Sequence, residues 1–585
     1  MQPRRQLLAD GERVALGRRA LDIISVLAEA RGGIVTKDEL LEAVWPGVVV
    51  EENALQVHMV PLRKALGPEA ARLSTVRGVG YQLRLDPVGT VPADPHPAAP
   101  APSVRSDTGE RGVSVVVLPF ENMSADPQQD YFADGITEDI ITDLSQVSAL
   151  RVIARNSAFA FKGKHVDVVD IARQLNVTHV LQGSVRRSDK RLRVSAQLID
   201  GGTNDHIWAQ RYDRDLADIF DLQDELTEAI VGALRLSLLP SEKKGIGTRN
   251  AEAYDLYIRA RALRATMQVE NIRRSVEAYH QALELDPSFA MAWAGLASAL
   301  LQNMTLLADS TIDLAEVDNA LARAMELSPD SPAIAASKGF RCLFGLDWAG
   351  AESCIASFAT GPDESWTVHS HLLLTLGRAN EAAECQFRVW RSDPLSPGAN
   401  WGLQFHLDCA GRLAEAEAQF EKNSGLAGMR TAMEWAAITR MMALGEHDNV
   451  KDRFKAWFSH DIERIPYAPM LSEALDRPED AKAIIREAFF SEANANQLQL
   501  DSLAHWAAHL GDDELALAII RRSAVETRGF LGMGIWHPNF ARIRRDLRFK
   551  DILRDLGLID HWRRTGNWGE FVRPIGESDF EVIAG

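Results

Sequence analysis

The sequence of 585 residues predicts a multidomain chain with an α+β module first, an α/β module second and an all-α array of helical repeats last. Three observations predict this order. A proline-rich stretch isolates the first 86 residues, apolar segments of strand length then alternate with helical patterns, and glycines recur every 34 residues further on. We expect five segments, at residues 1–86, 87–112, 113–240, 241–530 and 531–585.

Composition excludes several classes of protein. Hydrophobic residues make up 46% and charged residues 25% of the chain, as is ordinary for globular domains. The formal net charge is −18, so the chain has no uniformly basic coat for nucleic acid. It has no apolar run of about 18 residues and no secretory leader, so we expect a cytoplasmic protein without a membrane partner. Its four cysteines form no C-x-x-C pair, and we expect neither a metal nor another cofactor.

The first module is less acidic than the rest of the chain. It carries 12 Lys and Arg against 11 Asp and Glu, whereas the remainder has a net charge of −19. Residues 60–84 are locally basic, which is typical of a nucleic-acid footprint but also of a solvated face. Residues 87–112 hold six of the 24 prolines, which favour an extended linker.

The elements of the first module follow from its apolar spacing. Residues 20–30 place Leu21, Ile24 and Leu27 on one helical face, and Thr36–Glu39 has the spacing of a capping box for a second helix. Residues 53–66 predict a third helix with Leu55, Met59, Leu62 and Leu66 toward the core. Residues 73–85 alternate around two glycines, as a β-hairpin does.

Two stretches of this module carry a resemblance. ELLEAVWPGVVVEENALQVHMVPLRKALG, followed by TVRGVGYQL, resembles the winged-helix DNA-binding domain of OmpR/PhoB-type regulators. The resemblance implies that helix 53–66 lies in the major groove and that the hairpin around Arg77 is the wing. It also implies that the loop 46–52 touches RNA polymerase in activators. The residues of that loop are Pro46, Gly47, Val48, Glu51 and Glu52.

The chemistry of the third helix and the hairpin suits this role. Asn53 and Gln56 can hydrogen-bond to base edges, and Val57 or Val60 can contact a thymine methyl group. Cationic side chains in the same segment neutralise phosphates. The predicted DNA-binding residues are Asn53, Gln56, Val57, Val60, Arg63, Lys64, Arg77 and Tyr81.

Two positions depart from the family pattern. Val60 and Pro61 stand where relatives often have arginines, so strong guanine readout is not expected from these positions. Pro61 also removes a hydrogen bond inside the predicted helix. A tetratricopeptide adaptor whose winged helix has lost DNA binding therefore remains an alternative.

Residues 113–240 predict an α/β module. Strands are expected at 113–118, 151–155, 178–186, 191–199 and 206–212, and helices at 134–147, 166–176 and 217–238. VLPFENMSADPQQDYFADGITEDI and LQGSVRRSDKRLRVSAQLID resemble the TolB-like N-terminal domain, which accompanies nucleotide cyclases and tetratricopeptide regulators.

Two charged clusters stand out in this module. Acidic residues recur from Asp126 to Asp143, and we expect them to cap a helix and to keep it solvated rather than to bind calcium. Basic residues from Arg186 to Arg193 either lie on the solvent face of a hairpin or bind an anion.

Residues 241–530 predict helical repeats. Gly377, Gly411 and Gly445 are spaced by 34 residues, and ALELDP (282–287) and AMELSP (324–329) mark helix ends. This period resembles tetratricopeptide repeats, which implies a concave surface for a protein or peptide partner. The closing stretch, 531–585, resembles a capping segment of such arrays.

The sequence contains none of the common catalytic motifs, so we expect no enzyme. Our interpretation is a bacterial transcription regulator that binds double-stranded promoter DNA, as a homodimer or as tandem copies. The second and third modules sense a signal or a partner. The alternatives are the adaptor described above and an accessory protein of a nucleotide cyclase system.

Overall fold

The computed structural model divides the chain into two compact units, Met1–Thr108 and Gly109–Gly585. In the first unit it describes residues 8–9, 12–13, 19, 23–24, 26–27, 34–36, 40, 44, 59, 73–76 and 80–83. In the second it describes residues 113–124, 126–147, 149–188, 191–234, 236, 247–266, 268–307, 314–357, 366–424, 429–458, 466–491, 497–527 and 534–583.

The first unit is built on short strands. β1 (Leu8–Ala9) pairs antiparallel with β2 (Glu12–Arg13). A second sheet has the order β3-β5-β4, from β3 (Ile34–Thr36), β5 (Gly80–Leu83) and β4 (Leu73–Val76). The expected hairpin at 73–85 is therefore confirmed. The expected core residues Ile24, Leu27 and Met59 are buried.

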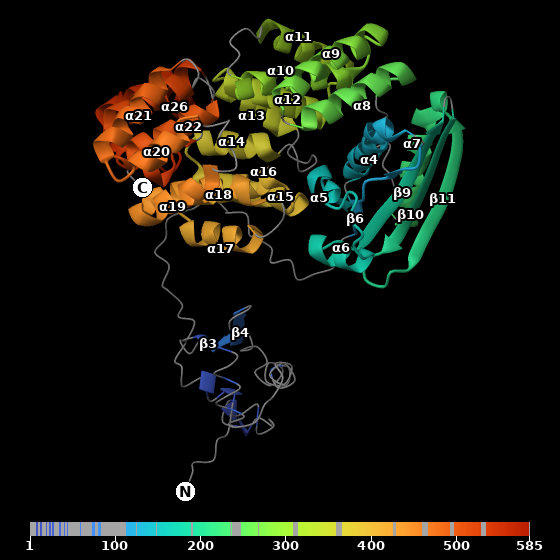
Figure 1. The fold of residues 1–585 in the computed structure, drawn as a ribbon, viewed down its shortest axis with the longest axis horizontal. Helices are drawn as coiled ribbons and strands as arrows, with labels where there is room; N and C mark the ends of the chain where they lie inside the picture. Colours follow the sequence, from blue (N-terminus) through green and yellow to red (C-terminus); the bar gives the residue numbers. More distant parts are fainter. Residues whose placement is uncertain are drawn as a thin grey trace. The chain divides into compact units, whose positions relative to one another are not determined.

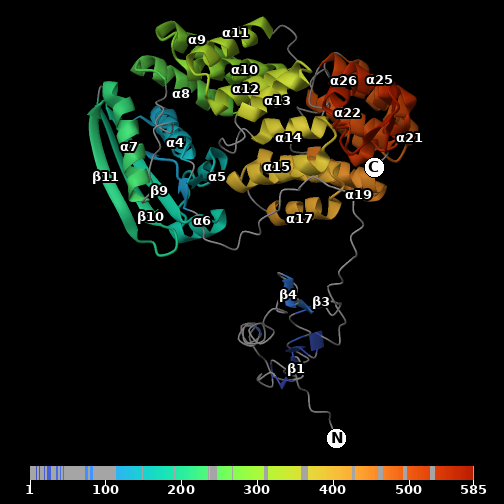
Figure 2. The same cartoon turned by 180° about the vertical axis from the view of Figure 1, so that it is seen from behind.

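A mixed sheet forms the centre of the α/β module, with the order β11-β10-β9-β6-β8 and β7 beside β9. β6 runs parallel to β8 and β9, and the long strands β9, β10 and β11 are antiparallel. The helices lie on the face of this sheet that is turned toward the repeats (Figures 1 and 2). The strands are β6 (Ser114–Val117), β7 (Glu121–Asn122), β8 (Arg151–Val152), β9 (His179–Ser188), β10 (Arg191–Asp200) and β11 (His206–Asp215).

The helices of this module are α4 (Asp130–Ser145), α5 (Arg155–Phe159), α6 (Val168–Leu175) and α7 (Ile219–Ala233). The sequence predicts each of them except α5. The prediction for α4 started four residues late, because a 3-10 turn at Pro127–Gln129 leads directly into the helix. Asp126 caps that turn by accepting a hydrogen bond from the Gln128 amide.

Antiparallel helix pairs make up the repeats. Their bounds are α8 (Ala251–Ala265), α9 (Val269–Leu285), α10 (Ala290–Leu307), α11 (Leu314–Leu327), α12 (Pro332–Phe344), α13 (Trp348–Ser357), α14 (Trp366–Thr375) and α15 (Ala379–Ser392). They continue with α16 (Pro397–Cys409), α17 (Leu413–Asn423), α18 (Met429–Leu444), α19 (His447–Phe458), α20 (Ala468–Ala474), α21 (Pro478–Phe490), α22 (Gln497–His509) and α23 (Asp513–Arg521).

The glycine period marks the turns inside the helix pairs. Gly377, Gly411 and Gly445 have φ angles of 77°, 70° and 75°, and each lies between the two helices of a pair. The left-handed conformation ends the first helix and is strained for residues with a side chain, which explains the spacing of these glycines. The predicted repeat is confirmed, and so is the predicted fold class.

The C-terminal segment folds back onto the middle of the array. It holds α25 (Leu547–Asp555), α26 (Leu558–Thr565) and a hairpin of β12 (Val572–Ile575) and β13 (Asp579–Val582). The buried indoles of Trp536 and Trp562 donate hydrogen bonds to the carbonyls of Thr375 and Leu376, each over 3.1 Å. The segment is thus packed against α14 as well as against the last repeat.

Candidate functional sites

The predicted DNA interface is described only in part. Of its residues, Tyr81 lies on β5, where it pairs with Val35 of β3 and Thr75 of β4. The other predicted DNA contacts and the loop 46–52 lie outside the described residues. β4 and β5 are joined by residues 77–79, so Arg77 belongs to the connection of the predicted wing.

A buried ionic network joins α4 to the first repeat. Arg261 of α8 lies 2.5 Å from Glu138 and 2.6 Å from Asp139, both on α4. Tyr254 donates its hydroxyl hydrogen to Asp139, and the Gln223 amide donates to the Tyr254 oxygen over 2.8 Å. Asp139 is only 4% exposed. The expectation that the acidic residues of this helix serve capping and solubility is therefore wrong for these two, because they bind the repeat.

Burial and ion pairing set the protonation of this network. Burial raises the pKa of Asp139, and Arg261 opposes that shift. Burial also acts to raise the pKa of Glu138, but Arg261 and Arg155 hold it below the ordinary value. The carboxylates of α4 and the guanidinium of Arg261 on α8 can be buried only because each neutralises the other. This mutual dependence holds the α/β module against α8.

Three arginines of the basic hairpin, Arg187, Arg191 and Arg193, form ion pairs within the protein. Arg187 of β9 lies 2.5 Å from Asp255 of α8, and the Tyr131 hydroxyl donates to the same carboxylate over 2.9 Å. Burial and Asp255 raise the pKa of Tyr131 to about 12. Arg191 and Arg193 both pair with Asp213 of the neighbouring strand. Arg191 and Arg193 therefore lie on the solvent face of the hairpin, as the first of the two alternatives predicted. Arg187 contacts the repeats in addition.

A third contact lies farther along the array. Asp393, in the turn between α15 and α16, accepts hydrogen bonds from the Ser157 amide over 2.8 Å and from its hydroxyl over 2.6 Å. Asn156 donates to the same carboxylate over 2.9 Å. The α/β module is therefore held to the repeats at α8 and again more than 120 residues later.

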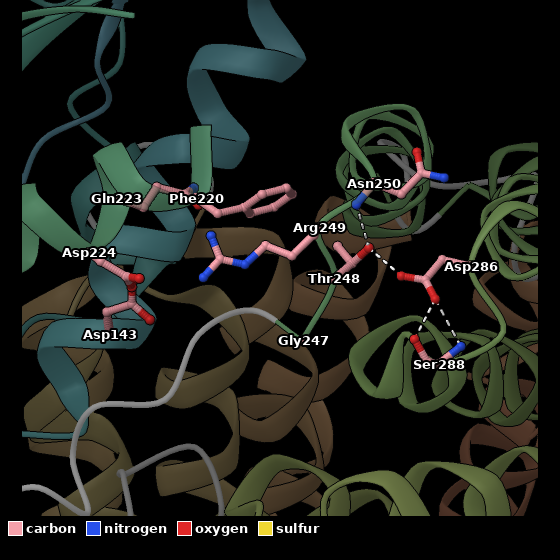
Figure 3. A pocket seen from close by; sticks show the side chains of 10 residues that line it. All are labelled: Asp143, Phe220, Gln223, Asp224, Gly247, Thr248, Arg249, Asn250, Asp286 and Ser288. Carbon is pink, nitrogen blue, oxygen red and sulfur yellow. Dashed lines mark hydrogen bonds between the residues drawn. The ribbon is translucent and has the colours of Figure 1, made fainter. Parts of the chain in front are cut away.

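A pocket of about 720 Å³ opens where the α/β module meets the first repeats (Figure 3). One wall comes from α4 and α7, and the other from residues 247–250, which precede α8, and from residues 286–288, which follow α9. Its lining residues are Asp143, Phe220, Gln223, Asp224, Gly247, Thr248, Arg249, Asn250, Asp286 and Ser288.

Capping interactions hold the repeat side of the pocket. Asn250 caps α8 by accepting from the amides of Glu252 and Ala253 over 3.0 and 3.1 Å. Asp286 accepts from the Ser288 amide over 2.9 Å and from the Thr248 hydroxyl. Burial acts to raise the pKa of Asp286, but these bonds hold it below the ordinary value.

The opposite wall is acidic and contains an unsatisfied acceptor. The carboxylates of Asp143 and Asp224 face each other across neighbouring helices (Figure 3). Burial, with Asp139 and Asp224 nearby, raises the pKa of Asp143 well above the ordinary range. Gln223 is 2% exposed, and its Oε1 accepts no hydrogen bond from any described residue. Arg249, the cation of the lining, pairs with Asp221 over 2.5 Å.

Sequence analysis singled out only Asp143 among these lining residues. The available signal was the acidic character of both predicted helices, 134–147 and 217–238, but their pairing could not be foreseen. Among the described residues, no group of three or more His, Cys, Asp or Glu could hold a metal ion. None of the helices in the described part of the chain combines the length and the hydropathy that a membrane-spanning segment requires.

Comparison with known proteins assigns the first module to a family. Residues 11–83 match the family described as "Transcriptional regulatory protein, C terminal". The transcriptional regulatory protein PrrA of Mycobacterium tuberculosis is 36% identical over 86 residues, which are 14% of this chain and 37% of that protein. The first module is thus an OmpR/PhoB-type domain, as its motifs predicted.

A different relative matches a longer stretch. The protein named "Putative adenylate cyclase 3" of Rhizobium meliloti is 51% identical over 212 residues, 35% of this chain and 34% of that protein. The chain thus spans about a third of the length of these curated relatives. TolB from Acinetobacter baumannii is a structural neighbour at 17% identity and a TM-score of 0.18, covering 21% of this chain and 29% of that one, which is too low to carry an argument.

Proposed function

Because the first module is an OmpR/PhoB-type DNA-binding domain, we propose that the protein is a transcription regulator whose second unit receives a signal. The observation that carries the proposal is the family match over residues 11–83. In this account helix 53–66 reads promoter DNA and the wing around Arg77 holds phosphates. The proposal assigns no reaction to the chain, and it places the protein in the cytoplasm.

The contacts within the second unit support the proposal that the α/β module and the repeats respond to a signal together. The α/β module is tied to α8 through Arg261 and Asp255, and to the α15–α16 turn through Asp393. A ligand or partner that binds either part therefore acts on both. The repeats are proposed to bind a protein or peptide, the loop 46–52 to contact RNA polymerase, and two copies to occupy repeated half-sites on DNA.

Fluorescence anisotropy tests DNA binding by the full chain. The labelled DNA is the region upstream of the protein's own gene, with a scrambled duplex as its control. We expect tighter binding to the upstream DNA, and weaker binding to both duplexes after Lys64→Ala or Arg77→Ala because a phosphate contact is lost. Arg105→Ala removes the same charge from the linker and serves as the matched control. Equal losses in all three variants would contradict a specific interface.

The second candidate is an accessory protein of a nucleotide cyclase system. The 51% identity to the Rhizobium meliloti protein favours it. It predicts a stable complex between the second unit and a cyclase, with no shift of any DNA by the full chain. Co-purification of the tagged full chain from its own cells, followed by the anisotropy measurement, separates the two candidates.

A further inference from the structure

We propose that Cys342 and Cys354 form a dithiol that hydrogen peroxide oxidises reversibly to a disulfide. Cys342 lies on α12 and Cys354 on α13, which are the two helices of one repeat. All four cysteines of the chain are thiols in this structure. The proposal does not depend on the DNA-binding role of the first module.

The two cysteines face each other across this helix pair. A Cβ added at Gly350 would lie 3.0 Å from the Cys342 sulfur, so this sulfur lies against the first turn of α13. Cys354 follows Gly350 by four residues and therefore lies on the same face of α13. In the other direction, a Cβ added at Gly339, three residues before Cys342, would lie 3.7 Å from the Cys354 Cβ. The two thiols thus lie between two reciprocal contacts of the helices.

The missing side chains of two glycines allow the close approach that a disulfide requires. The Cβ atoms of bridged cysteines are about 3.8 Å apart. A separation of this size exists between α12 and α13 at Gly339, where the added Cβ is 3.7 Å from that of Cys354. Since the Cys342 and Cys354 thiols already hydrogen-bond to each other, closing the bond needs no new contact between the helices.

This hydrogen bond divides the roles of the two thiols. It lowers the pKa of Cys354 to about 7, an effect that Lys338 supports and burial opposes. The same bond, together with burial, raises the pKa of Cys342, which keeps its proton and donates it toward the Cys354 sulfur. The thiolate is the nucleophilic form of cysteine, so Cys354 is the nucleophile and Cys342 the resolving thiol.

The other two cysteines are less reactive by the same criteria. Burial raises the pKa of Cys385 to about 12, and it raises the pKa of Cys409 well above its ordinary value. Cys354 is 9% exposed, whereas Cys385 is 5% and Cys409 2% exposed. This small exposure favours an oxidant as small as hydrogen peroxide, and the pKa difference directs it to Cys354.

Hydrogen peroxide is the only oxidant that the reaction needs. The Cys354 thiolate attacks one peroxide oxygen and expels hydroxide, which takes up the proton released by the thiol, and Cys354 becomes a sulfenic acid. The Cys342 sulfur then attacks the Cys354 sulfur, and hydroxide leaves with the Cys342 proton as water. The two thiols lose two electrons and two protons, and one peroxide becomes two waters. A dithiol reductant reverses the bond by exchange.

The bond would cross-link a helix that supports the C-terminal segment. Trp348 of α13 donates a hydrogen bond to the Leu556 carbonyl over 2.8 Å. Glu352, also on α13, lies 3.4 Å from His561 of α26. A disulfide holds α13 to α12 at the next turn, so we expect slower hydrogen exchange of the α12 and α13 amides in the oxidised protein.

Peptide mass spectrometry of the full chain tests the proposal. Trypsin leaves both cysteines in one peptide, 342–378, and releases Cys385 and Cys409 in two others. The reduced chain is treated with hydrogen peroxide, denatured and alkylated with iodoacetamide. We expect peptide 342–378 to lose both alkylations together, with a mass two hydrogens below its reduced form, at least about tenfold faster than Cys385 and Cys409 lose theirs. Dithiothreitol is expected to restore both alkylations.

Single variants test the two roles. Dimedone, which traps sulfenic acids, is expected to label Cys354 in Cys342→Ser and to leave Cys342 unlabelled in Cys354→Ser. Cys385→Ser is the matched control and is expected to form the disulfide at an unchanged rate. Retained alkylation of peptide 342–378 in the wild-type chain would overturn the proposal, as would equal loss of alkylation from all three peptides. Equal dimedone labelling of the two variants would overturn the division of roles.

Discussion

Arg261 is predicted to be the most important single charge at the junction between the α/β module and the repeats. It is 12% exposed at its side chain and lies between Glu138 and Asp139, at 2.5 and 2.6 Å. Arg261→Met keeps most of the side-chain volume but leaves two carboxylates without their shared partner. Removing one member of a buried ion pair costs about 3–5 kcal/mol, so we expect a loss of about 4 kcal/mol in the free energy of unfolding of the second unit.

Urea unfolding followed by circular dichroism measures this loss, and hydrogen exchange of the α8 amides localises it. Arg173→Met is the matched control, because Arg173 pairs with Asp170 on α6 with side-chain exposures of 72% and 60%. An exposed pair of this kind contributes at most about 1 kcal/mol. Equal shifts in the two variants, or unchanged exchange of α8, would refute the reasoning that this network joins the two modules.

Two further predictions concern the turns of the array and its buried histidines. Gly411→Ala is expected to lower the free energy of unfolding by about 1 kcal/mol, because its φ of 70° is strained for alanine. Gly569→Ala is expected to lower it more, since the added Cβ would also lie 2.7 Å from two backbone carbonyl oxygens. Thermal unfolding of both variants compares the two losses. Burial lowers the pKa of several described histidines, among them His371 and His505, whose values fall to about 3, and His406 and His509, whose values fall to about 4. The unfolded chain binds these protons from about pH 6.5 downward while the folded chain does not, so stability present above pH 6.5 is lost as the pH falls toward 4. Burial raises the pKa of Asp408 to about 7 and of Asp501 to about 6, which opposes the loss. Together these four histidines and two aspartates are expected to lower the free energy of unfolding by about 2–3 kcal/mol per pH unit near pH 5.5, measured by urea unfolding; constant stability between pH 6.5 and 5 would contradict it.

Local patterns predicted most of the fold. The strands β9, β10 and β11 and the helices α6 and α7 lie close to their predicted ranges, because alternation and helical spacing are properties of neighbouring residues. The glycine period predicted the turns at Gly377, Gly411 and Gly445 for the same reason, since a left-handed glycine follows the first helix of each of these three pairs.

Long-range contacts were the part that the sequence did not reveal. Asp139 has the same local pattern as a solvated residue of an acidic helix, and only its approach to Arg261, 122 residues later, makes it a buried ion-pair partner. Trp536 finds its acceptor at Thr375, 161 residues earlier, where the C-terminal segment folds back. The pocket combines residues from Asp143 to Ser288, and no spacing rule connects them.

The salt dependence of DNA binding by the full chain tests the central claim most directly. We predict that log Kd on the upstream DNA rises linearly with log salt concentration, and that Lys64→Ala reduces this slope by about one unit while Arg105→Ala leaves it unchanged. Absence of DNA binding even at low salt would contradict the account of this protein as a transcription regulator.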